Sequence, residues 1–439
     1  MKNTIKLALV AAMAMGATSA FATNGDNLIG LGAKSRAMGG TGIAHFNGSE
    51  SATSNPALIT KAKGSNISFG GTYFSPDVTV KTTGTPAPPL GAGQNPVSAT
   101  SDAKHNVIPY VALTENLGNG FVVGASMFGS AGMGTDWRDS GANTVLTDGQ
   151  FGLYSMRSNL LLLKFSVPVA YGQDNWSVGI APVLMYGALD MSFDSSAGAD
   201  VGNGSSSDFG FGYELGAAYE LPDLGLTIAA MYHSSISMTY DDQVATTGAA
   251  FGFVGAPGGA AAFSDTLEQP AEIGIGVDWT EGDLSVTADI KQIQWEDAEG
   301  YGEFGWEDQT VYALGAEYRM DDLAIRVGYN YAKNPIKENT TATSTITGAT
   351  LSPTYNPATD GPLVGDAINA LNHVMFPAIT ESHYTLGLGY QFTKNVGADF
   401  ALTYATSPDV SVAANTVGLG TITTTNDQFA FSGNLNYSF

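Results

Sequence analysis

Long stretches of the sequence alternate apolar with polar residues, and this period of two constrains the fold more than any other feature. In residues 426–439, one parity carries Phe429, Phe431, Leu435, Tyr437 and Phe439. The other parity is mostly small and polar. Successive side chains of a strand point to opposite faces, so each such strand has one apolar and one polar face. An apolar face toward lipid and a polar lumen are typical of an outer-membrane barrel.

The same alternation predicts an all-β fold, a 14-stranded antiparallel transmembrane β-barrel. The predicted strands are 65–80, 106–115, 120–133, 157–171, 176–193, 208–221, 225–240, 269–280, 284–295, 309–319, 323–331, 381–392, 395–406 and 426–439. Short connections rich in Asn, Asp, Gly and Pro, as tight hairpins require, alternate with long ones. A soluble periplasmic sandwich, the alternative, does not explain why every second connection is long.

Composition excludes several functional classes. The chain has 439 residues, 41 acidic against 17 basic side chains, a net charge of −24, and no cysteine. Such acidity would repel nucleic acid, and the lack of Cys excludes disulfides and thiolate metal sites. The 5 histidines lack metal-ligand spacing, and no catalytic motif is present, so we predict no metal, no cofactor and no enzymatic activity.

The first 22 residues have the features of a secretory signal peptide. Lys2 and Lys6 precede the apolar stretch 7–15, and Ala20-Phe21-Ala22 forms a cleavage site. Cleavage before Thr23 removes two lysines, so a net charge of −24 becomes −26. The next segment, 23–63, does not alternate and is rich in Gly and Ala. We expect it to pack inside the barrel as a hatch, with 64–439 forming the barrel and the mature protein in the outer membrane of a Gram-negative cell.

Three segments resemble a known family. GLGAKSRAMGGTGIAHFNGSESATSNPALIT (residues 30–60) resembles the hatch of the FadL-type outer-membrane transporters, which include TodX-like proteins, and Asn55-Pro56-Ala57 matches its motif. GFVVGASMFGSAGMGTDW resembles the family's kinked third strand, and FPAITESHYTLGLGYQF its late-strand block. The resemblance implies passive uptake of hydrophobic molecules, with a lateral opening at the third strand. The opening would lie at Phe128, Gly129, Gly132 and Gly134, although glycines could also simply end an ordinary strand.

Two long loops are candidate capture sites. Phe251, Phe253 and Phe263 lie among small residues of loop 241–268, as an exposed apolar binding surface would, or else the loop buries them itself. In loop 334–380, Ile368, Leu371 and Met375 have helical spacing and could line the same groove or pack on the barrel rim.

Alternation also places charged residues in the lumen: Lys164, Glu214, Glu272, Asp278, Asp289, Lys291, Glu317, Arg326, His383 and Asp399. Buried charges need partners, so we expect most of them to form ion pairs that hold hatch and barrel together. Lys291 and Arg326 are the candidates for binding a fatty-acid carboxylate.

The family resemblance implies long-chain fatty acids as the predicted cargo, with aromatic or aliphatic hydrocarbons as the alternative and a general diffusion porin as the second. A porin would lack the hatch. An outer-membrane lipase is disfavoured because His383 faces the lumen and no nucleophile motif accompanies it. The expected partners are the hydrophobic ligand, outer-membrane lipid and lipopolysaccharide, and the barrel assembly machinery, whose recognition signature the terminal Phe439 resembles. We expect no nucleic acid and a monomer.

Overall fold

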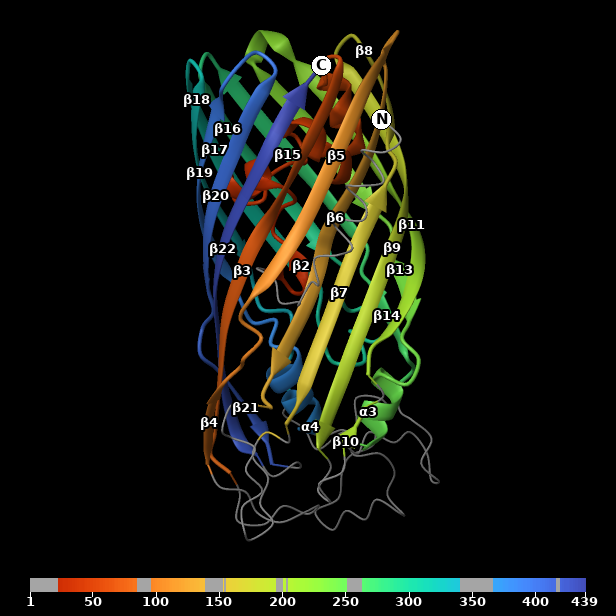
Figure 1. Ribbon diagram of the computed structural model, residues 1–439, viewed down its shortest axis with the longest axis vertical. Coiled ribbons are helices and arrows are strands. Elements are labelled where there is room, and N and C mark those ends of the chain that lie inside the picture. Colours follow the sequence, from red (N-terminus) through yellow and green to blue (C-terminus); the bar gives the residue numbers. More distant parts are fainter. Residues whose placement is uncertain are drawn as a thin grey trace.

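The computed structural model describes residues 23–84, 96–138, 153, 155–194, 200–202, 204–250, 263–339, 366–415 and 419–439. Within them, fourteen antiparallel strands form a closed barrel (Figure 1). They are β3 (Ser65–Thr82), β5 (Asn106–Gly118), β6 (Phe121–Asp136), β7 (Arg157–Ser166) continued by β8 (Val169–Gln173), β9 (Trp176–Asp194), β11 (Ser206–Leu221), β12 (Leu226–His233), β15 (Glu272–Glu281), β16 (Leu284–Ile293), β17 (Gln309–Met320), β18 (Leu323–Ala332), β19 (Ser382–Gln391), β20 (Val396–Thr406) and β22 (Gly420–Ser438). The last strand closes the barrel by pairing with the first, from Ile422 opposite Thr82 to Ser438 opposite Asn66.

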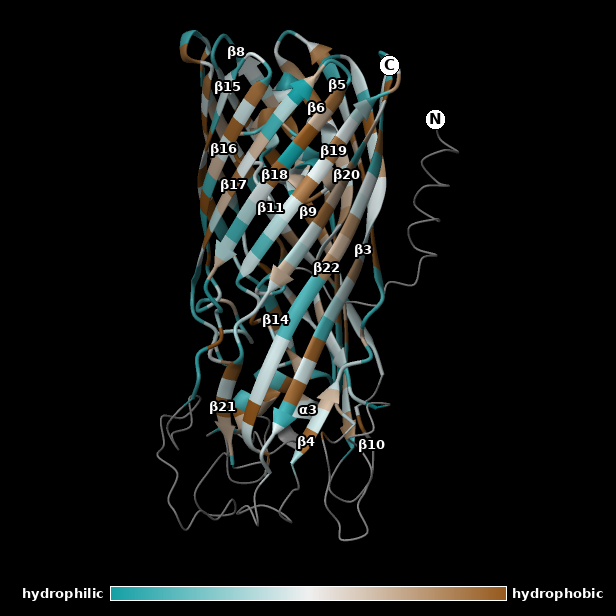
Figure 2. Cartoon of the chain, turned by 90° about the vertical axis from the view of Figure 1, so that its left-hand side faces the viewer, coloured by the Kyte–Doolittle hydropathy of each residue, from teal (hydrophilic) through white to brown (hydrophobic). Residues whose placement is uncertain are grey.

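The predicted faces are confirmed. On β22, Phe429 and Phe431 are exposed on the outer surface, while Ala430, Ser432 and Asn434 are buried toward the lumen. Figure 2 shows the resulting change of hydropathy from residue to residue along the barrel strands. A sheet that closes on itself has no edge strand, and a lipid environment requires this closure.

The two ends of the barrel differ. Tight turns and the C-terminus lie at one end, including η3 (Pro222–Leu224). The other end carries β4 (Val97–Thr100), β10 (Asp200–Val201), β21 (Val410–Ala414), α3 (Val244–Ala250), α4 (Ala367–Ala370) and the π-helix η4 (Leu371–Met375) (Figure 1). None of the described helices is long and apolar enough to cross a bilayer.

Two predicted strands are interrupted in the structure. The predicted strand 157–171 is one barrel strand, since β7 and β8 both pair with β6 and β9, but Pro168, which cannot donate a ladder hydrogen bond, separates its two parts. The predicted strand 225–240 leaves the barrel ladder after His233. Its outer part, β13 (Ile236–Thr239), pairs instead with β14 (Thr266–Gln269) in a separate two-stranded sheet. Pro270 lies between β14 and β15.

The segment 23–63 lies inside the barrel, as predicted (Figure 1). It consists of a small hairpin, β1 (Thr23–Asn24) with β2 (Asn27–Leu28), a short helix α2 (Ala33–Ala37), and two 3-10 turns, η1 (Gly48–Thr53) and η2 (Pro56–Lys61). Many of its small apolar residues are fully buried against the wall, among them Ala33, Ala37, Ala52 and Ala57. The predicted signal peptide, 1–22, lies outside the described residues.

Candidate functional site

The Asn55-Pro56-Ala57 triplet anchors the hatch to the barrel wall. The Asn55 side chain accepts a hydrogen bond from the Ala57 amide (3.0 Å), capping η2, and its amide donates to the Ile43 carbonyl (2.7 Å). The same amide reaches the Ala230 carbonyl of β12 at 3.3 Å. Glycines 179 and 216, on β9 and β11, leave the room for this turn, since a Cβ at either would collide with it.

The third barrel strand, β6, has a β-bulge within its glycine-rich segment. Opposite β7, Gly129 faces Leu163 and Ala131 faces Leu162, so Ser130 is the extra residue of a β-bulge. On its other edge, β6 pairs with β5 only as far as Phe128 opposite Tyr110. Beyond that pair the inward-facing Ile108 side chain packs against Gly129. Beyond this pair, β5 and β6 are therefore no longer joined by ladder pairing.

The hatch hairpin occupies the edge of β6 that β5 leaves free. Asn27 lies opposite Ala131, and the Gly132 amide donates to the Asp26 carbonyl oxygen (3.1 Å). The Asp26 carboxylate accepts hydrogen bonds from Tyr301 and from Gln269 (3.3 Å), both from the end of the barrel with long loops. Complete burial raises the pKa of Asp26 to about 6. The hairpin thus connects the bulged strand with the loops.

A cavity of about 100 Å³ lies between this hairpin and the wall. Leu28, Ile29, Met185, Met231 and Ile236 are among its apolar lining residues, and Ser130 of the bulge also lines it. Hydrophobic side chains around a few polar groups are typical of a site for a small apolar ligand.

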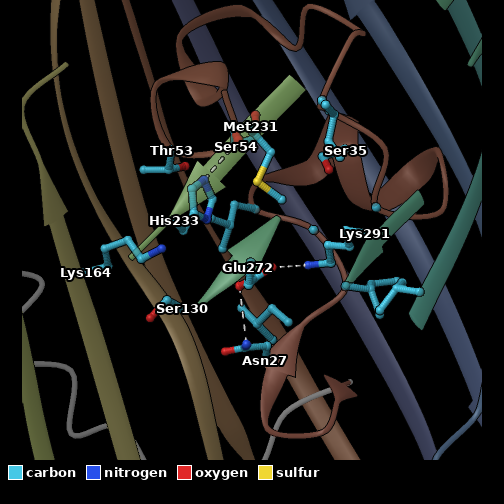
Figure 3. A pocket seen from close by; sticks show the side chains of 18 of the residues that line it. Asn27, Ser35, Thr53, Ser54, Ser130, Lys164, Met231, His233, Glu272 and Lys291 are labelled. Carbon is cyan, nitrogen blue, oxygen red and sulfur yellow. Dashed lines mark hydrogen bonds and ion pairs between the residues drawn. The ribbon is translucent and has the colours of Figure 1, made fainter. Parts of the chain in front are cut away.

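Two ion pairs contribute charged side chains to the lining of this cavity. Lys291 Nζ lies 2.7 Å from Glu272 Oε2, and Lys164 Nζ lies 3.1 Å from Glu214 Oε1. Figure 3 shows Glu272 between Lys291 and Asn27, whose amide donates to Glu272 Oε1 at 3.4 Å. His233 Nε2 lies 3.2 Å from the Ser54 carbonyl oxygen. Of the lining charges that sequence alone placed in the lumen, Lys164, Lys291 and Glu272 are in ion pairs, whereas Asp289 accepts hydrogen bonds from backbone amides of the hatch.

Arg326 does not join Lys291 in this cavity. It bonds Glu317 (2.6 Å) and Asp399 (2.7 Å), and it lines a second cavity of about 520 Å³ that includes residues of the tight turns. Lys34 of the hatch approaches the same Asp399 at 3.7 Å, whereas Arg36 donates from Nε to the Gly30 carbonyl (3.0 Å). The Arg326 guanidinium already bonds two carboxylates, one of which also pairs with Lys34 of the hatch. We therefore assign Arg326 to an ion-pair network that supports the hatch.

The candidate capture residues lie at the end with long loops. Phe251 and Phe253 fall outside the described residues. Phe263 is buried, with its ring 5.2 Å from that of Phe304, so it is not the exposed side chain that a capture surface requires. Ile368, Leu371 and Met375 form the predicted helical segment, α4 with η4, and all three are buried in the same apolar cluster.

Sequence reasoning missed several residues of the site. Pro109 stands just beyond the last β5–β6 pair, and a proline inside a predicted strand does signal a break in pairing. Asn27, Ser130 and His233 carried no comparable signal. Among the described residues, no group of three or more His, Asp and Glu side chains could hold a metal.

Comparisons with known proteins agree with this geometry. The family described as "Outer membrane protein transport protein (OMPP1/FadL/TodX)" matches residues 7–347. The Pseudomonas putida toluene transporter TodX superposes with a TM-score of 0.63 at 19% identity, over 95% of this chain and 100% of that one. A Pseudomonas aeruginosa FadL homologue gives 0.63 at 17% identity, over 94% and 100%.

A curated relative has no assigned activity. It is an uncharacterized Chlorobium limicola protein from the 5′ region of a phosphoenolpyruvate carboxykinase gene, 49% identical over 72 residues. The match covers 16% of this chain and 36% of that relative. The family match, by contrast, spans most of the sequence. The chain therefore belongs to the OMPP1/FadL/TodX family of outer-membrane β-barrels, non-enzymatic channels that transport hydrophobic compounds.

Proposed function

We propose that this channel takes up long-chain fatty acids and releases them sideways into the membrane between β5 and β6. The supporting observation is the cavity itself, because Ser130 of the β6 bulge and the hatch hairpin both line it. A ligand in the cavity therefore lies directly behind the part of the wall where β5–β6 pairing has ended.

The physical reason for a sideways exit is the cost of water. Moving apolar surface into water costs about 25 cal/mol per Å², so an exit into lipid avoids a penalty that a periplasmic exit would incur. In this proposal Phe128 and the glycines at 129, 132 and 134 form the opening, and Ile108 must move aside. Lys164 and Lys291 are cations that line the cavity, while Arg326, which lines the other cavity, has no part in binding.

Uptake of a labelled fatty acid by cells that depend on this channel tests the route. Replacing Gly129 and Gly132 together by Val should straighten and crowd β6, because a Cβ at position 129 lies 2.5 Å from Ile108 Cγ2. We expect reduced uptake with the barrel still folded, as judged by its mobility on unheated gels. Unaltered uptake in a folded variant would exclude the lateral route.

Hydrocarbons are the second candidate cargo. TodX, which superposes on 95% of this chain, is described as a toluene transporter. In the present chain the two lysines that line the cavity are already paired with glutamates of the protein. Competition between a fatty acid and an alkane or toluene in the same uptake assay separates the two: the true cargo inhibits at the lower concentration.

A further inference from the structure

The carboxylate of Glu272 lies in the cavity where the carboxylate of a fatty acid would bind. Its Oε2 lies 2.7 Å from Lys291 Nζ, and Oε1 accepts from the Asn27 amide. The side chains of Lys291 and Glu272 remain 17% and 13% exposed, enough for a ligand to contact this pair. The position that a fatty-acid head group would take beside Lys291 is therefore filled by the protein.

The ammonium group of Lys164, the second lysine that lines the cavity, is also paired. Lys164 lies 3.1 Å from Glu214, whose side chain is only 1% exposed. Asp289 adds a further negative charge to the lining and accepts the Gly42 and Ile43 amides at 2.8 and 3.0 Å. The charged and titratable groups around Glu272 come from β16, β12, β7, β11 and the hatch hairpin: Lys291, Asp289, His233, Lys164, Glu214 and Asp26.

A carboxylate anion entering this site would be an unpaired negative charge. Either it stays without a cation, or it takes Lys291 and leaves Glu272 buried with only a neutral amide. Both outcomes carry the large penalty of an uncompensated buried charge. One proton removes the penalty, whether it remains on the fatty acid or passes to Glu272 while the ligand carboxylate takes Lys291.

We infer that Glu272 is a specificity-determining residue that makes the cavity accept ligands without net charge: an alcohol, a hydrocarbon, or a fatty acid accompanied by one proton. This inference rests on the proposed function and adds to it. It assigns to Glu272 the selection against anions, and it makes fatty-acid binding proton-linked.

The test compares decanoic acid with decanol, two ligands of equal chain length, on the full mature channel in lipid nanodiscs. Since a carboxyl group has a pKa of about 4.3, decanoic acid is ionised between about pH 6 and about pH 8. Binding of one proton then raises the dissociation constant of the acid about tenfold for each unit of pH increase. We expect that slope for the acid, a pH-independent constant for decanol, and uptake of one proton per acid in calorimetry with buffers of different ionisation enthalpy.

The variant Glu272→Gln frees Lys291 for the ligand. It should bind decanoate with a pH-independent constant and without proton uptake. Glu281→Gln, the same change at the exposed other end of β15, is the matched control and should keep the wild-type slope.

Wild-type protein decides the question even if Glu272→Gln does not fold. Decanoate binding that is independent of pH, without proton uptake, overturns the role of Glu272 and leaves the proposed function intact. If neither decanoic acid nor decanol binds, and hexadecanoic acid does not bind either, the proposed function fails as well.

Discussion

At the scale of the residue, the hatch depends on positions where the wall has no side chain. Asn55 can reach both the Ala57 amide and the Ala230 carbonyl only because Gly216 stands behind it. The strand pattern identifies residue 216 as lumen-facing, but gives no reason for glycine there. The reason is a contact with a segment roughly 160 positions earlier in the chain.

Gly216→Ala should therefore loosen the hatch and not the barrel. A Cβ at this position would collide with Asn55 Oδ1 and lie 2.9 Å from the Ala57 nitrogen. We expect a loss of about 1–3 kcal/mol in hatch docking, typical of overpacking. Hydrogen exchange of residues 43–60 measures it, with Gly433→Ala as the control, because its nearest contact, Phe400, lies at 3.4 Å. Equal exchange in both variants would contradict the prediction.

At the scale of the element, the β1–β2 hairpin is held by a buried acid. Burial raises the pKa of Asp26 to about 6 from its ordinary value of 3.8, so docking favours the protonated form. Protonation of Asp26 contributes its full stabilisation of hairpin docking below about pH 4. This stabilisation is lost as the pH rises through 6, a change of roughly 2–3 kcal/mol in the free energy of docking.

A spin label on the hairpin should report this change. Its mobility should increase between about pH 4 and about pH 7 in the wild type and stay constant in Asp26→Asn, which keeps the shape but cannot ionise. A wild-type signal that does not vary with pH would show that the surroundings of Asp26 compensate its charge.

The junction of β5 and β6 can be locked, because the natural chain has no cysteine. An ideal Cβ at Gly129 lies 3.7 Å from Ile108 Cβ, which suits a disulfide. Ile108→Cys with Gly129→Cys should block uptake when oxidised and restore it on reduction. Ala112→Cys with Ser126→Cys, a pair already in register, should transport in both states. Blocked transport in both pairs would point to general damage and not to a gate.

At the scale of the whole molecule, the start of the described chain is enclosed. Thr23 is 5% exposed and Asn24 fully buried inside the barrel. Cleavage before Thr23, which the sequence predicts, would place the new N-terminus at this enclosed position.

Intact-mass measurement of the channel from outer membranes should find a chain that begins at Thr23. A mass that includes residues 1–22 would refute the predicted cleavage. Substituting Ala22 with a bulky residue should retain the leader, because the A-x-A site requires small side chains, and should reduce the amount of channel in the membrane.

The sequence by itself determined the barrel, its lipid-facing and lumenal faces, and the hatch. Because side chains alternate along a strand, the position of a residue in the strand indicates whether it faces lipid or the lumen. That information is local. It did not determine partners within the lumen. Lys291 and Arg326 share a lumenal parity, yet one lies at the cavity with Glu272 and the other between Glu317 and Asp399. Asn27 meets Glu272 across 245 positions. Such contacts follow from strand register and from the path of the hatch, and only the closed tertiary structure fixes both.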